Sequence, residues 1–122
     1  MHVRHPLDRR GSAMAVVTFD PGHARFVIAG NLRFFLSTTD GHVFHLLRAA
    51  CPHRGGPLHL GQLDADAGTI RCPWHDGEVS LRCLQRDAAP LVVRPGSATA
   101  VVPDPGGEPI TVDGRLVLAT RR

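Results

Sequence analysis

Glycine and proline interrupt this chain so often that long helices have little room between them. The 122 residues include 13 Gly and 10 Pro, a content typical of many turns and short strands. Between these breaks lie short runs rich in Val, Ile, Leu and Phe, residues that favour β-structure. We expect strands over residues 15–19, 25–29, 33–37, 43–48, 69–71, 78–81, 91–93, 99–102, 110–112 and 116–119.

Two sequence signals predict tight hairpin turns. Thr39-Asp40-Gly41-His42 lies between two of the apolar runs, and Asp113-Gly114 lies between the last two. Asp-Gly is a strong hairpin signal because its residues accept the positive φ angles of such turns. No segment has the length and period of a convincing helix. The sequence therefore predicts an all-β fold built from small antiparallel sheets.

The length of the chain predicts a single domain. Residues 1–13 are polar, basic and without period, so we expect a flexible N-terminal arm before one domain over residues 14–122. No apolar run approaches the roughly 18 residues needed to cross a bilayer. We therefore expect no membrane partner.

The net charge of +3 comes from the two ends of the chain. Residues 1–13 contain three Arg and one Asp, and the chain ends in two more Arg, whereas the remaining stretch is close to neutral. A nucleic-acid-binding protein needs a clustered basic face, and none is evident in the sequence, so we expect no nucleic-acid partner. Three cysteines do not form a disulfide framework, so we expect a cytoplasmic protein with reduced thiols.

Two Cys/His pairs stand out from the strand pattern. Cys51-x-His53 and Cys72-x-x-His75 are separated by eighteen residues, and a Pro follows each Cys. Thiolate and imidazole ligands suit iron–sulfur clusters, zinc or copper. Zinc is the strongest alternative metal, because two Cys and two His bind it tetrahedrally. The familiar zinc spacing, however, pairs Cys with Cys and His with His on a hairpin and a helix, which this sequence does not offer.

The two segments CPHRGGPL at 51–58 and CPWH at 72–75 resemble the two signature boxes of the Rieske iron–sulfur family. The resemblance runs from about Val27 to Leu118 and implies a Rieske-like fold, in which two loops form a cluster-binding subdomain. It also implies a [2Fe–2S] cofactor with two thiolates on an inner iron and two imidazoles on an outer iron. The implied ligands are, in that order, Cys51 and Cys72, then His53 and His75.

The resemblance also indicates a subtype. Respiratory Rieske proteins carry extra cysteines that form a disulfide between the boxes, but here Gly56 and Trp74 stand at those positions. The high-potential proteins also use a Tyr hydroxyl as a hydrogen-bond donor, and this chain has no Tyr. Fewer donors imply a lower reduction potential. The chain is therefore similar to soluble Rieske ferredoxins and to the Rieske domains of ring dioxygenases, although Val79 and Ser80 replace the Phe and Asp expected after the second box.

The resemblance implies an electron carrier rather than an enzyme. Its expected partners are a flavin-dependent ferredoxin reductase, which supplies single electrons, and a terminal oxygenase, which accepts them. The alternatives are a non-catalytic Rieske subunit of a larger oxygenase or nitrite reductase complex, and a zinc-binding interaction module. Outside the two boxes, Cys83 shares strand parity with Leu81, so we expect a buried, structural thiol. We expect His59 to be an exposed bystander of the first loop.

Overall fold

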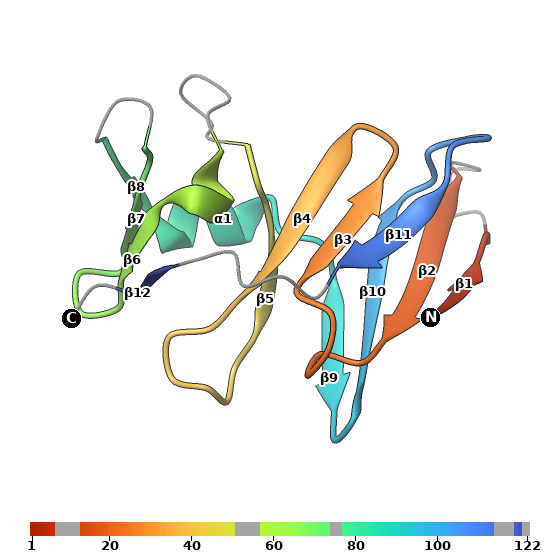
Figure 1. The fold of residues 1–122 in the computed structure, drawn as a ribbon, viewed down its shortest axis with the longest axis horizontal. Helices are drawn as coiled ribbons and strands as arrows, with labels where there is room; N and C mark the ends of the chain where they lie inside the picture. Colours follow the sequence, from red (N-terminus) through yellow and green to blue (C-terminus); the bar gives the residue numbers. More distant parts are fainter. Residues whose placement is uncertain (7–12, 51–56, 74–76, 114–118, 121–122) are drawn as a thin grey trace.

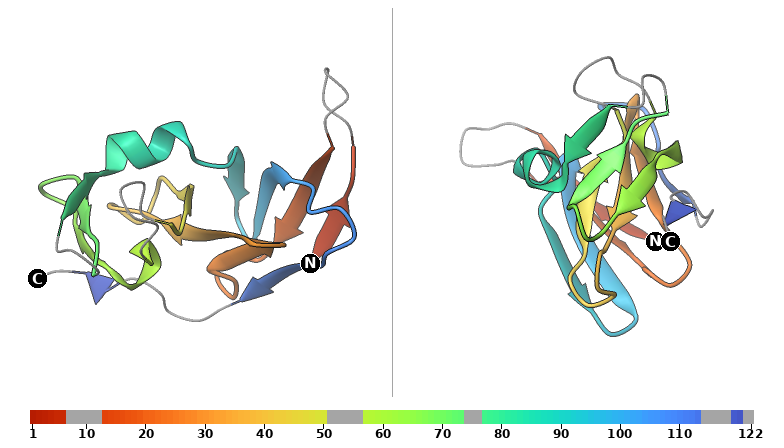
Figure 2. Two further views of the ribbon diagram at one scale, coloured as in Figure 1. Left: turned by 90° about the horizontal axis from the view of Figure 1, so that it is seen from above. Right: turned by 90° about the vertical axis from the view of Figure 1, so that its left-hand side faces the viewer.

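The computed structural model describes residues 1–6, 13–50, 57–73, 77–113 and 119–120. The strands in this part of the chain form three four-stranded sheets (Figure 1). The second sheet lies between the first and the third, as both views of the long axis show (Figures 1 and 2). This architecture confirms the predicted all-β fold of small, mainly antiparallel sheets.

The first sheet brings two strands from the start of the chain together with two strands from residues 91–103. Its strands, in spatial order, are β1 (His2–Arg4), β2 (Met14–Phe19), β10 (Ser97–Pro103) and β9 (Leu91–Arg94). Buried residues alternate with half-buried ones along β2 and β10, because successive side chains of a strand point to opposite faces. The inward-facing residues of these two strands are Ala15, Val17, Phe19, Ala98, Ala100 and Val102.

The second sheet is buried on both faces. Its strands, in spatial order, are β11 (Ile110–Asp113), β3 (Phe26–Ala29), β4 (Leu32–Ser37) and β5 (His45–Arg48). Phe34 and Leu46 pack with the inward residues of the first sheet, and we call this cluster the first core. Phe35 and Leu47, one residue further along each strand, belong to a second cluster, which we call the second core. The run of four buried residues at the end of β4 follows from this two-sided burial.

The third sheet contributes buried residues to the second core. Its strands, in spatial order, are β12 (Ala119–Thr120), β6 (Gln62–Asp64), β7 (Thr69–Arg71) and β8 (Glu78–Ser80). A 3₁₀ turn, η1 (Leu58–Leu60), precedes β6, and a helix, α1 (Leu81–Arg86), follows β8. The second core consists of Phe26, Phe35, Leu47, Ala49, Leu58, Leu63, Ile70, Cys72, Val79, Leu81 and Leu84.

Helix α1 corrects two expectations from the sequence. The side chain of Ser80 accepts a hydrogen bond from the N–H of Arg82 at 3.2 Å and caps the helix, so β8 ends one residue earlier than predicted. Leu81 and Leu84, three residues apart, are buried against the second core. Cys83 lies between them on the helix and is exposed. The predicted buried thiol at Cys83 is therefore wrong, because a helical period replaces the strand parity on which it rested.

One predicted hairpin is confirmed, with a longer loop (residues 38–44) than the tight turn expected, and most of the other lies outside the described residues. Strands β4 and β5 pair antiparallel, with Ser37 opposite His45, around the loop that contains Asp40. The carboxylate of Asp40 accepts hydrogen bonds from the N–H groups of His42 at 2.7 Å and Val43 at 2.9 Å. Strand β11, by contrast, pairs with β3, whereas β12 pairs parallel with β6 in another sheet, well separated from β11 in Figure 1. Residues 114–118, which carry most of the rest of the predicted Asp113-Gly114 hairpin, lie outside the described residues.

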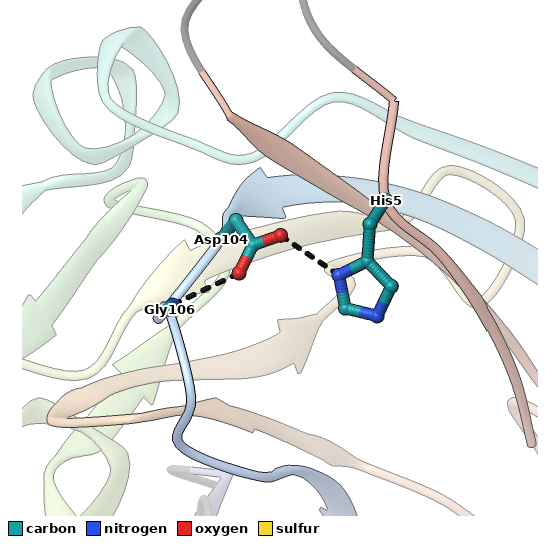
Figure 3. Close-up of polar contacts among 3 residues, drawn as sticks. All are labelled: His5, Asp104 and Gly106. Carbon is teal, nitrogen blue, oxygen red and sulfur yellow. Dashed lines mark hydrogen bonds and ion pairs between the residues drawn. The ribbon is translucent and has the colours of Figure 1, made fainter.

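The N-terminal segment also differs from the sequence prediction. Strand β1 pairs antiparallel with β2, so the structure corrects the expected loose arm at His2–Arg4, while residues 7–12 lie outside the described residues. A hydrogen bond of 2.7 Å joins His5 Nδ1 to Asp104 Oδ2, and Gly106 N–H donates to Asp104 Oδ1 at 2.9 Å (Figure 3). The bond from His5, and then that from Gly106, lower the pKa of Asp104 below its ordinary 3.8. This contact attaches β1 to the end of β10.

None of the helices in the described part of the chain is long and apolar enough to cross a membrane.

Asp104→Ala should loosen β1 without unfolding the domain. The expected result at neutral pH is lower hydrogen-exchange protection of the β1 amides, measured by NMR, with protection in β4 unchanged. Because the pKa of Asp104 is lower in the folded state, its contribution is complete well above pH 3.8 and is lost as the pH falls below that value. The wild-type β1 amides should therefore lose protection on acidification before those of β4.

Asp20→Ala is the matched control, because Asp20 makes the same kind of contact within a turn. Its Oδ2 lies 2.7 Å from His23 Nδ1, and its Oδ1 accepts from Gly22 N–H at 2.8 Å. This variant should leave β1 protection unchanged. Equal β1 protection in wild type and Asp104→Ala at neutral pH would contradict the proposed attachment.

Candidate metal centre

The residues on either side of the first Cys/His box are held together. Ala50 and Pro57 form an isolated antiparallel bridge, and Leu58 N–H donates to the carbonyl oxygen of Ala49 at 2.7 Å. The chain therefore leaves the end of β5 and returns to the same place seven residues later, at the start of η1.

The second Cys/His box is closed in the same manner. Cys72 follows the last residue of β7, and its N–H donates to the carbonyl oxygen of Gly77 at 2.9 Å. One residue further from the loop, Arg71 pairs with Glu78 in the β7–β8 ladder, and their side chains form an ion pair of 3.6 Å. Residues 74–76 are thus bracketed by a backbone hydrogen bond and by a ladder pair.

The stems of the two loops meet in the second core. Leu58, at the end of the first loop, and Cys72, at the start of the second, are both fully buried in this core. Ile70 on β7 is also fully buried there, together with Phe35 of the second sheet. An apolar platform built from two sheets therefore carries both predicted ligand loops.

Cys72 is the one predicted ligand within the described residues. Its side chain is 0% exposed at the end of β7. Cys51, His53 and His75, the other three predicted ligands, and Trp74 lie outside the described residues. Within the described residues no group of three or more His, Cys, Asp or Glu side chains could hold a metal ion.

The chemistry of Cys72 fits a cluster ligand. A thiolate is a soft ligand suited to iron–sulfur clusters, and an apolar surrounding keeps water from the metal and tunes its potential. The fully buried position of Cys72 meets the second requirement. The contrast with Cys83, which is exposed on α1, distinguishes the two described thiols.

Sequence reasoning missed one residue of this platform. Gly61, directly after η1, lies against the backbone of β7, close to the carbonyl oxygen of Arg71. Nothing in the sequence marks Gly61 among the many glycines of the chain, since its role depends on how η1 packs on a strand further along.

Comparison with known proteins gives a consistent result. A family model described as "Rieske [2Fe-2S] domain" matches residues 12–94, most of the chain. A human protein named "Rieske domain-containing protein" is 42% identical over 40 residues, which cover 31% of this chain and 26% of the human protein. The chain thus matches about a quarter of the length of that relative. No solved structure matches. The family match confirms the resemblance predicted from the two boxes.

Replacement of the buried thiol should be distinguishable from replacement of the exposed one. We expect Cys72→Ser to lose the bound iron and the visible absorption, because a hydroxyl is a poor ligand for a soft metal centre. Cys83→Ser is the matched control and should keep both, since Cys83 is exposed on α1. Iron analysis and visible spectra of anaerobically purified variants provide the measurement. Equal loss of iron in the two variants would show that the ligand prediction is wrong.

Proposed function

Since the chain belongs to the Rieske [2Fe–2S] domain family, we propose that it is a Rieske-type ferredoxin that carries single electrons from a flavin-dependent reductase to a terminal oxygenase. The family binds a [2Fe–2S] cluster, and its general role is electron transfer rather than catalysis. The observation that carries the proposal is the buried Cys72, at the start of the second loop, which shares the second core with Ala49 and Leu58 at the base of the first loop.

Four residues of this chain hold the cofactor in our proposal. Cys51 and Cys72 bind the inner iron, and His53 and His75 bind the outer iron. When bound, the cluster supplies a centre that accepts and donates one electron at a time. The second core holds the stems of both loops, so that the ligand pairs are presented from one rigid base.

The proposed low-potential type rests on two groups that this sequence lacks, a disulfide between the boxes and a Tyr hydroxyl. Gly56 and Trp74 occupy the positions of the disulfide cysteines of respiratory relatives, and no Tyr is available as a donor. Scarce hydrogen bonds to the sulfur atoms leave the reduced state less stabilised, which lowers the reduction potential. A low potential suits acceptance of electrons from a flavin that NAD(P)H reduces. A cytoplasmic location belongs to the same proposal, because thiol ligands remain reduced there.

A second candidate function is a non-catalytic Rieske subunit of a larger oxidoreductase complex, of the oxygenase or nitrite reductase type. The same family match supports it, since a Rieske [2Fe-2S] domain serves in either role. The two candidates differ in the lifetime of the complex. Size-exclusion chromatography with the oxygenase distinguishes a transient carrier from a stable subunit.

Metal content tests the proposed cofactor directly. Protein purified without air should be red-brown and should contain two irons and two acid-labile sulfides per chain, in accord with the [2Fe–2S] description of the family. Iron, zinc and sulfide analyses on one sample provide the measurement. Stoichiometric zinc without sulfide would favour the zinc-binding module instead.

The reduction potential tests the proposed electron route. We expect a value near the lower end of the Rieske range, which extends from about −150 to +300 mV, and above the plant-type ferredoxins at about −400 mV. Protein-film voltammetry measures it, and NADH with a flavin-dependent ferredoxin reductase should bleach the visible band. A potential near the top of the range would indicate a respiratory type of acceptor and would contradict the proposed oxygenase partner.

A further inference from the structure

Gly61 occupies a position that has no room for a side chain. It follows η1, and its N–H donates to the carbonyl oxygen of Leu58 at 2.9 Å. Its φ of −78° and ψ of −172° are ordinary extended values that any residue adopts. Backbone conformation therefore does not require glycine at this position, and the reason must be space.

The space is limited mainly by backbone atoms. A Cβ on Gly61 would overlap the carbonyl oxygen of Arg71 and would lie 3.1 Å from that of Leu58. It would also lie 3.1 Å from Cγ2 of the fully buried Ile70. A backbone oxygen in a paired strand cannot rotate away as a flexible side chain can. Any side chain at Gly61 would therefore push η1 away from β7.

This contact lies between the two predicted ligand loops. The first loop ends at Pro57, one residue before η1, and the bridge from Ala50 to Pro57 ties η1 to its stem. On the other side, Arg71 is the last residue of β7 and directly precedes Cys72. The close approach of Gly61 to Arg71 therefore sets the distance between the base of one loop and the base of the other.

We propose that Gly61 is a positioning residue for the cluster, because its missing side chain lets η1 lie directly on the backbone of β7 and so fixes the spacing of the two ligand pairs. The inference rests on the proposed function, in which one ligand pair comes from each loop. Gly61 itself contacts no ligand atom in this account and acts through the backbone of Arg71 and through the η1 turn.

The test compares Gly61→Ala with Gly107→Ala. Gly107 is the matched control, because a Cβ there meets nothing within 4 Å and its φ needs no glycine. Both variants are prepared anaerobically, and their iron content, EPR g-values and reduction potential are measured. We expect Gly107→Ala to match wild type. We expect Gly61→Ala either to bind less than half of the wild-type iron or to show shifted g-values and a shifted potential.

Hydrogen exchange separates positioning from general destabilisation. In Gly61→Ala, the amides of β2 and β10 should keep wild-type protection, because the first core is remote from the contact, whereas those of β6 and β7 should lose protection. Full iron content with wild-type g-values and potential in Gly61→Ala would overturn the proposal. The proposal would also be overturned if Gly61→Ala kept the wild-type g-values and potential and lost hydrogen-exchange protection uniformly across all strands.

A second variant covers the case in which Gly61→Ala does not fold. Leu58→Val shortens a fully buried side chain at the other end of η1 and leaves Gly61 in place. We expect Leu58→Val to shift the g-values and the reduction potential, because η1 would pack less tightly on the second core. Unchanged g-values and potential in folded Leu58→Val would overturn the proposal. Failure of the proposed function has a different signature, namely zinc or no sulfide in the wild-type protein itself.

Discussion

The bases of both predicted ligand loops depend on the packing of the third sheet against the second sheet. Phe35 and Leu47 are at most 1% exposed, and they pack in one core with Leu58 and Ile70, which are fully buried. Full burial of such side chains stabilises a protein by about 1.5–3 kcal/mol each. The region around the loops is therefore held by the second core, which contains no residue of the first sheet.

In this arrangement the packed second core holds the base of each predicted ligand loop. The bridge from Ala50 to Pro57 and the hydrogen bond from Cys72 to Gly77 close each loop at its base. Closed stems reduce the conformational freedom that a cofactor would otherwise have to remove on binding. Protein ligands held in advance by a packed base are the general requirement for a site with defined geometry.

The parts of the fold that depend on local sequence were predictable. The strand over residues 15–19 and the hairpin around Asp40 each depend on a few adjacent residues, and the structure confirms both. The cofactor and the family were predictable because the spacing within each Cys/His box is short and specific. The residue assignment of the four ligands stays a prediction, and Cys72 is the one predicted ligand among the described residues.

The features that sequence reasoning missed depend on contacts between distant segments. The cap at Ser80 turned a predicted strand end into α1, and the buried pair Leu81 and Leu84 stabilises that helix only because the second core is beside it. The parallel pairing of β12 with β6, and the attachment of β1 through His5, likewise join segments far apart in the chain. The tight seat of Gly61 belongs to the same class, because the oxygen that limits it comes from β7.

The central claim is that two thiolates and two imidazoles, one of each from each loop, hold a single two-iron centre. Pulsed EPR of the reduced protein, labelled with ¹⁵N only in histidine, tests this claim most directly. The account predicts hyperfine couplings from two histidine nitrogens bound to the same iron, both lost in Cys72→Ser with the cluster itself. A reduced cluster without any coupling to histidine nitrogen would contradict the account, because the iron would then be held without the two imidazoles.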